Sequence, residues 1–155
     1  KIVVSNSLEN NNYPFNKNII RAPLFNNGID LVNASELVVS KPGMGILQDC
    51  IATQKPLLFL PGDFPERSLK IHLLNKLLGN NLPLLRKISS SELKECIDRC
   101  LDITNLYKTA YAKVHTNGAD VLSKSIELIK NAKPHNINDY IHQLYKITPF
   151  HPIDR

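Results

Sequence analysis

The sequence has few glycines, few cysteines and no long hydrophobic run. Its longest unbroken apolar stretch, Leu57 to Leu60, is far short of the roughly 20 residues that span a bilayer, which argues against a transmembrane helix. The first residues also lack the apolar region and the small-residue cleavage site of a signal peptide. Because the chain opens on Lys1 instead of Met, at the start of a predicted strand, we expect a fragment or an excised domain of a longer protein.

Cysteine is scarce and odd in number: Cys50, Cys96 and Cys100 all lie in segments with apolar periodicity. This usage predicts reduced thiols in a cytoplasmic protein and no disulfide framework. Cys96 and Cys100 would share one face of a helix, which raises the question of a metal site. No neighbouring His or Cys completes a zinc spacing, so we interpret both as small buried hydrophobes.

Basic residues outnumber acidic ones, 19 to 14, which gives a net charge of +5. The lysines are scattered, so a solvated surface is the default interpretation. A basic surface also favours anionic ligands or an anionic membrane face, and peripheral association with the inner face of the membrane therefore stays open. We expect no nucleic-acid partner, because neither a reading motif nor interleaved basic and aromatic residues are present. With no Asp-x-Asp motif, we expect no metal site.

Strand-like and helix-like segments alternate along the chain. Consecutive apolar residues at 37–39 and 57–60 are typical of strands buried on both faces of a parallel sheet. This order predicts a doubly wound α/β domain of the Rossmann-like type, with right-handed crossovers, over residues 1–131, followed by a helical tail over 132–155. The expected strands are 1–5, 18–24, 36–40, 56–60 and 82–88, and the expected helices are 28–34, 44–53, 63–78, 90–101, 118–131 and 138–145.

Two of the six glycines lie in "SKPGMG", residues 40–45, between a predicted strand and a predicted helix. In such sheets, ligands bind where a strand's carboxyl end leads into a helix. Gly43 and Gly45 permit positive φ and a close approach of the backbone to a ligand. The helix start favours an anion, to which Ser40 adds a hydroxyl and Lys41 a charge. The loop therefore suits a diphosphate, although a plain tight turn at Pro42 and Gly43 would use the same residues. It is neither Gly-x-Gly-x-x-Gly nor a P-loop.

The stretch "ASELVVSKPGMGILQDCIATQKPLLFLPGDFPE" resembles the C-terminal domain of GT-B glycosyltransferases, in the group related to the bacterial peptidoglycan N-acetylglucosaminyltransferase. The later "TNGADVLSKSIELI" is similar to the closing helix of that group, and the resemblance covers about residues 1–130. It implies a domain that binds a nucleotide-sugar donor, with a UDP-sugar as the default, and that uses neither a metal nor another cofactor. It also implies an N-terminal acceptor-binding domain that this chain lacks. Because that domain usually supplies the base, no catalytic residue is assigned here.

The resemblance assigns three groups of substrate-binding residues. Asp49 matches the acidic residue that binds the ribose, although the family more often has Glu; a solvated carboxylate near a helix start is the alternative. The spacing of Asp63 and Glu66 also fits a capping box, which is a structural alternative to contact with the sugar. His72 is interpreted as a surface residue. The donor diphosphate would contact Ser40, Lys41, Pro42, Gly43, Met44 and Gly45, and the donor sugar would contact Gly62, Asp63 and Glu66.

Two other functions stay open. One is a non-catalytic module that uses the same fold for ligand sensing or protein contact, which Asp49 in place of Glu favours. The other is a nucleotide-sugar hydrolase or epimerase. An upstream Rossmann-like half with a candidate base would support a glycosyltransferase, while product formation without an acceptor would support a hydrolase.

Overall fold

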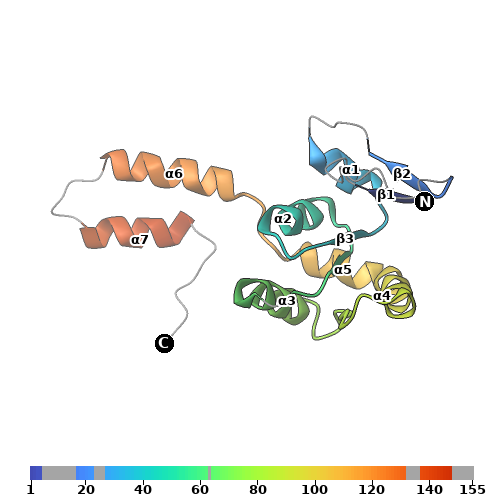
Figure 1. Cartoon of the computed structure of the whole chain (residues 1–155). Coiled ribbons are helices and arrows are strands. Elements are labelled where there is room, and N and C mark those ends of the chain that lie inside the picture. The colour runs from blue at the N-terminus through green and yellow to red at the C-terminus, as the bar shows by residue number, and fades with distance from the viewer. Residues whose placement is uncertain (5–16, 23–26, 63, 132–136, 148–155) are drawn as a thin grey trace. The chain divides into compact units, whose positions relative to one another are not determined.

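A computed structural model describes residues 1–4, 17–22, 27–62, 64–131 and 137–147. The chain divides into two compact units, Lys1–Tyr111 and Ala112–Arg155. The first unit contains the strands β1 (Ile2–Val4), β2 (Ile19–Arg21), β3 (Val38–Ser40) and β4 (Leu57–Phe59) (Figure 1). Its helices are α1 (Gly28–Ala34), α2 (Met44–Thr53), α3 (Pro65–Leu77), α4 (Ser90–Asp102) and α5 (Thr104–Tyr111). The second unit contains α6 (Gly118–Asn131) and α7 (Ile137–Ile147).

The strands pair in parallel, as predicted for an α/β domain. β1 pairs with β2 in the register Ile2 to Ile19, and β3 pairs with β4 in the register Val38 to Leu57. Within the described ranges these are two separate two-stranded sheets. The chain is therefore a mixed α/β protein with parallel strand pairs, and one continuous doubly wound sheet is not formed by the described residues.

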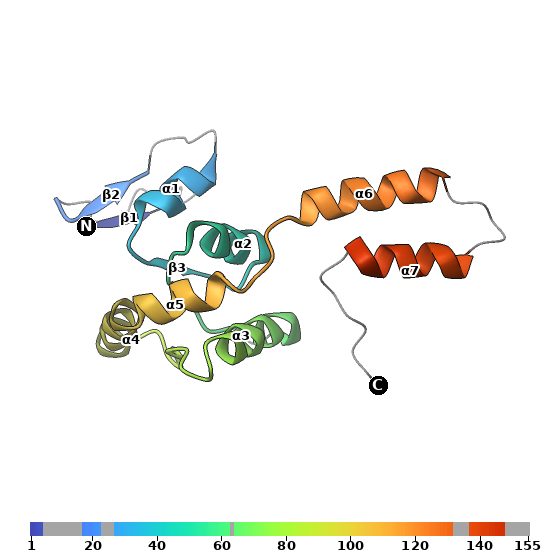
Figure 2. The ribbon, with the colours of Figure 1, turned by 180° about the vertical axis from the view of Figure 1, so that it is seen from behind.

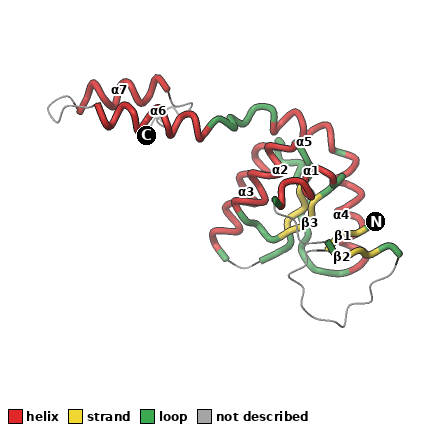
Figure 3. The backbone as a smooth tube through the Cα atoms, turned by 90° about the horizontal axis from the view of Figure 1, so that it is seen from above, coloured by secondary structure: helices red, strands yellow, loops and turns green. Residues whose placement is uncertain are grey.

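β4 lies at the centre of the hydrophobic core. Leu57 and Leu58 are both fully buried, and neighbouring residues of a strand point to opposite faces, so β4 is covered on both faces as predicted. Figure 3 shows the β3–β4 pair in yellow, surrounded by helices α2, α3, α4 and α5. β3 differs from the prediction, because Val39 is 40% exposed. In the described residues β3 has one strand neighbour, and its Val39 face reaches solvent.

Helices α1, α2 and α6 begin and end where the sequence predicts. The Asn27 side chain accepts a hydrogen bond from the Ile29 amide and caps α1. Gln54, in the left-handed conformation, ends α2. Because glycine and asparagine tolerate the left-handed conformation, Gly79 and Asn80 predict a stop after the helix at 63–78. Their φ values of +62° and +64° after α3 confirm it.

The strand predicted over residues 82–88 is wrong. The amide of Leu82 donates to the side-chain oxygen of Asn75, and the amides of Arg86 and Lys87 donate to the Glu92 carboxylate. Side chains thus satisfy backbone donors that a strand ladder would otherwise use, and Pro83 has no donor. The segment still contributes buried side chains to the core.

The C-terminal half of the first unit contains one predicted helix and one unpredicted helix. α4 begins at the predicted Ser90, and Ser89 caps it by accepting from the Glu92 amide. Helix α5 was not predicted at all, because it follows α4 almost without a break. Its buried side chains, Tyr107, Ala110 and Tyr111, belong to a segment too short for its periodicity to be distinctive.

The second unit is a pair of amphipathic helices. α6 and α7 run antiparallel and side by side, as both Figure 1 and Figure 2 show. Leu122, Ile126 and Ile129 of α6 are more than half exposed. None of the helices in the described part of the chain combines the length and the apolarity needed to cross a membrane.

All three cysteines are free and buried, which confirms the interpretation of Cys96 and Cys100 as small hydrophobes. Burial raises the pKa of the Cys50 thiol to about 12, with a smaller contribution from the Asp49 carboxylate. Burial likewise raises the pKa of Cys100 to about 11 and raises that of Cys96. No group of three or more His, Cys, Asp or Glu side chains among the described residues is arranged to hold a metal ion.

We expect these thiols to react with a disulfide reagent only after unfolding, because the thiolate is the reactive form and all three are buried. The same pKa values predict the direction of a pH effect. An unfolded thiol ionises near 9.0, whereas the folded chain keeps its proton, so the free energy of unfolding falls as the pH rises above about 9. Thiol labelling and urea unfolding, each measured from pH 7 to 10, test both statements. Rapid stoichiometric labelling of the folded chain at pH 8 would contradict them.

Candidate functional site

The loops that follow β3 and β4 begin side by side. Ser40 is in register with Phe59, and the Leu60 amide donates to the Ser40 carbonyl at 2.8 Å. Because the two strands are parallel, their carboxyl ends meet at one edge of the pair. The structure therefore brings together the two loops in which the sequence analysis places most of its candidate residues.

The first loop is a tight turn. The Gly43 amide donates to the Lys41 carbonyl at 2.8 Å, and Pro42 between them is buried while Lys41 is exposed. Gly43 has φ −105° and ψ 147°, so the positive φ expected there is wrong. Gly79 is the one glycine of the described residues with positive φ. The turn geometry alone therefore does not require glycine at position 43.

Because Gly43 has no side chain, the first amides of α2 lack a side-chain cap. Gly43 is the N-cap of α2 and provides no side-chain cap, and the first turn of α2 contains no acidic residue. The amides of Met44, Gly45 and Ile46 have no acceptor within the helix. Met44 is half exposed, and a Cβ added at Gly45 would meet nothing within 4 Å. These three backbone donors lie at the positive end of the helix dipole, which favours an anion.

Besides Lys41, a second cationic side chain lies at this loop, that of Lys70, which was not predicted from the sequence. The Lys70 ammonium, on α3, donates to the Pro42 carbonyl at 3.5 Å and also pairs with the Glu66 carboxylate. The Lys70 side chain is only 12% exposed, whereas that of Glu66 is 77% exposed. The hydrogen bond and the charge of Lys70 lower the pKa of Glu66. The four-residue spacing of Glu66 and Lys70 suggests a helical ion pair, but the contact with Pro42 depends on tertiary structure.

In the second loop, which follows β4, the Arg67 side chain lies against Phe64 and Gly62. The Arg67 guanidinium lies 4.6 Å from the centre of the Phe64 ring, and a Cβ on Gly62 would come within 2.8 Å of its Nη1. Gly62 therefore makes room for this side chain. Asp63 lies outside the described residues. Phe64 occupies the N-cap of α3, without a side-chain cap; the capping box expected for Asp63 and Glu66 involves a residue outside the described ranges.

The remaining candidates lie further along the helices. Asp49 is half-buried in α2, five residues after Met44, or roughly 7 to 8 Å along the helix axis. Its backbone carbonyl accepts from the Thr53 hydroxyl at 2.7 Å. His72 is exposed on α3, in agreement with its interpretation as a surface residue.

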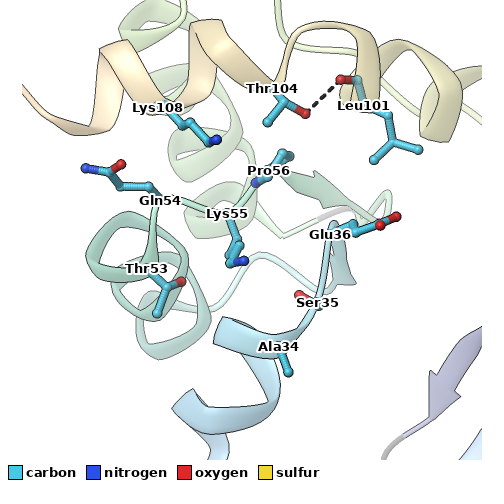
Figure 4. Close-up of a pocket in the computed structure, with 10 residues that line it drawn as sticks. All are labelled: Ala34, Ser35, Glu36, Thr53, Gln54, Lys55, Pro56, Leu101, Thr104 and Lys108. Atoms are coloured by element: carbon cyan, nitrogen blue, oxygen red, sulfur yellow. Dashed lines mark hydrogen bonds between the residues drawn. The ribbon is translucent and has the colours of Figure 1, made fainter.

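A cavity of about 520 Å³ lies elsewhere in the first unit (Figure 4). It is lined by the last residues of α1 and α2, by Lys55 and Pro56, and by Thr104 and Lys108 of α5. Ser35 and Glu36 precede β3, and Lys55 precedes β4, so this cavity lies at the amino ends of the strands. None of the described candidate residues lines it. The backbone donors of α2 and the Lys70 ammonium lie instead at the carboxyl ends of β3 and β4, the edge at which ligands of open α/β sheets bind.

Comparison with known proteins gives one informative similarity. No family model and no solved structure match the chain. The chain is similar to UDP-N-acetylglucosamine--N-acetylmuramyl-(pentapeptide) pyrophosphoryl-undecaprenol N-acetylglucosamine transferase of Prochlorococcus marinus (strain MIT 9312), with 27% identity over 148 residues. The alignment covers 89% of this chain but 39% of that protein, so the chain spans about two fifths of its relative's length. The similarity indicates a region related to a glycosyltransferase.

Proposed function

We propose that this chain is the donor-binding half of a glycosyltransferase, with the Rossmann-like organisation of a GT-B C-terminal domain over residues 1–131 and a helical tail over 132–155. The observation that carries the proposal is the uncapped start of α2 directly after β3, with its open backbone amides at Met44 and Gly45. An anion there would accept these hydrogen bonds. The similarity to part of a transferase whose name includes UDP-N-acetylglucosamine supports a nucleoside diphosphate as that anion.

The donor would then extend along the edge formed by the two loops. Its diphosphate would lie against Ser40, Lys41, Pro42, Gly43, Met44 and Gly45. Asp49, on the same helix, would accept hydrogen bonds from the ribose hydroxyls. The loop after β4 would face the sugar. Its contacts would be Gly62, Asp63 and Oε2 of Glu66, the carboxylate oxygen that does not accept from Lys70.

The proposed chemistry is attack by an acceptor hydroxyl on the anomeric carbon of the donor sugar, with the nucleoside diphosphate as leaving group. Amide donors and basic side chains at the diphosphate would stabilise the charge that develops on it. A second domain would supply the base and bind the acceptor. The basic surface of this chain fits peripheral contact with the cytoplasmic face of a membrane. We therefore expect this chain to bind a nucleotide and to transfer no sugar by itself.

Calorimetric titration of the chain with UDP, UDP-N-acetylglucosamine and inorganic pyrophosphate tests the proposal. We expect saturable binding of all three, with UDP tighter than pyrophosphate because the ribose adds hydrogen bonds to Asp49. Absence of binding by UDP and by its sugar would contradict the proposed function. Sugar transfer by this chain alone would contradict the assignment of the base to another domain.

Asp49→Ala provides the matched control for the ribose contact. Losing a hydrogen bond to a charged acceptor is expected to weaken UDP binding by about 10-fold, while pyrophosphate binding stays unchanged because it has no ribose. Equal losses for both ligands would show that Asp49 acts on the helix and not on the ribose.

A further inference from the structure

We propose that Lys70 is the positioning residue of the diphosphate loop, a role that deepens the proposed function and rests on it. Its ammonium would act through the Pro42 carbonyl: by holding this carbonyl, Lys70 fixes the turn that aims the first amides of α2 at the ligand. Glu66 would in turn hold Lys70 in this orientation. Lys70 lies 28 residues after Pro42 in the sequence. The geometry of the loop would then be set by a distant helix, α3.

The burial of Lys70 supports this role. A lysine on a solvated helix face keeps its ammonium in water, yet the Lys70 side chain is 12% exposed. In the described part of the chain, its ammonium donates to one carbonyl of the loop and to one carboxylate of its own helix. An ordinary helical pair of Glu and Lys would need only the carboxylate. The contact with Pro42 is the additional feature, and it ties the loop to α3.

The position of this contact explains why it would affect a ligand. Pro42 is two residues before Met44, so the backbone of Pro42, whose carbonyl Lys70 contacts, lies within about two residue lengths, or ~7 Å, of the first free amide of α2. Pro42 is also the centre of the turn closed by the Gly43 amide and the Lys41 carbonyl. If that carbonyl moves, Gly43 moves with it, and the direction of the Met44 and Gly45 amides changes. A positive charge at this place also favours the same diphosphate.

Hydrogen exchange of the ligand-free chain tests the role without any nucleotide. The reporters are the Gly43 amide, bonded to Lys41, and the Leu47 amide, bonded to the Gly43 carbonyl. The internal reference is the Lys55 amide, bonded to the Cys50 carbonyl at the other end of α2. In Lys70→Met we expect faster exchange at Gly43 and Leu47 and unchanged exchange at Lys55. Equal acceleration at both ends would mean a loss of global stability and would overturn the proposal, as would no change at any of them.

Ligand binding provides the second readout. In Lys70→Met we expect the affinities for UDP and pyrophosphate to fall by the same factor, about 10-fold, because the misdirected amides of α2 and the lost positive charge both affect the phosphates that the two ligands share. Lys70→Arg, which keeps the charge, should recover most of the affinity. Lys76→Met is the control, since Lys76 is exposed on the same helix and changes the net charge equally. An equal loss in Lys76→Met would reduce the effect to net charge and would overturn the proposal.

The two readouts separate this proposal from the proposed function. If the unmodified chain bound neither ligand, the proposed function would fail, and the exchange at Gly43 and Leu47 would still decide whether Lys70 positions the loop. If the chain bound both ligands and Lys70→Met left exchange and affinity unchanged, the function would stand and the role of Lys70 would fail. Should Lys70→Met not fold, Lys70→Gln replaces it with the same expectations, because its side chain is polar but uncharged and shorter than that of lysine.

Discussion

Replacing Gly43 with Asp is expected to abolish diphosphate binding while the fold stays intact. A Cβ at this position would meet Ile46 Cγ2 at 3.7 Å and the Lys41 carbonyl at 3.9 Å, both ordinary contacts, and φ of −105° suits any residue. Asp is also a better N-cap than Gly, so the free energy of unfolding should rise by up to about 1 kcal/mol. Its carboxylate would accept from the amides of α2 and repel a phosphate.

The expected loss of UDP affinity is on the order of 100-fold or more, because at least two charge-assisted hydrogen bonds to the ligand are lost. Calorimetry measures it, and thermal unfolding checks the fold. Gly43→Ser is the matched control, because its hydroxyl caps the helix without a negative charge and should weaken binding less. The site assignment would fail if Gly43→Asp bound UDP as tightly as the unmodified chain.

Replacing Tyr107 with Phe is expected to destabilise the first unit, although the ring stays in place. The Tyr107 hydroxyl donates to the Leu57 carbonyl of β4 at 2.9 Å and lies 3.7 Å from the Cys100 sulfur. Burial raises the pKa of Tyr107 far above its usual value, so the group stays a neutral donor. Its loss leaves a buried carbonyl short of one partner, which costs about 1 to 3 kcal/mol. Urea unfolding with an unchanged m-value measures this cost.

Tyr111 provides the matched control. Its ring packs edge-to-face on that of Tyr107, with the ring centroids 5.7 Å apart, and its hydroxyl is buried without a hydrogen-bond partner in the described part of the chain. Tyr111→Phe keeps the ring contact and removes a group that is desolvated without compensation. We expect an unchanged or increased stability. Equal destabilisation by both substitutions would show that the bond to Leu57 contributes nothing.

The sequence by itself determined the features that depend on neighbouring residues. The left-handed stop at Gly79 and Asn80 and the bounds of the helices at 28–34 and 44–53 depend on neighbouring residues, so they were predicted from single segments. The consecutive apolar residues of β4 likewise predicted burial on both faces. The resemblance of "SKPGMG" and its flanks to a glycosyltransferase domain directed attention to the joint between β3 and α2, and the similarity to a transferase of this kind agrees with it.

Only the tertiary structure decided the features in which distant segments meet. Residues 82–88 were predicted as a strand, but the amides of Leu82, Arg86 and Lys87 donate to Asn75 and Glu92, five to seven residues away. The apolar pattern of the segment does not reveal these partners. Helix α5 follows α4 so closely that its burial against β4, through Tyr107, defines it better than its own sequence does. At the site, local reasoning predicted an anion at a helix start but attributed the glycines to positive φ. The structure instead gives them a different physical role: they leave the first amides of α2 without a side-chain cap, and the Lys70 ammonium of α3 contacts the turn before them.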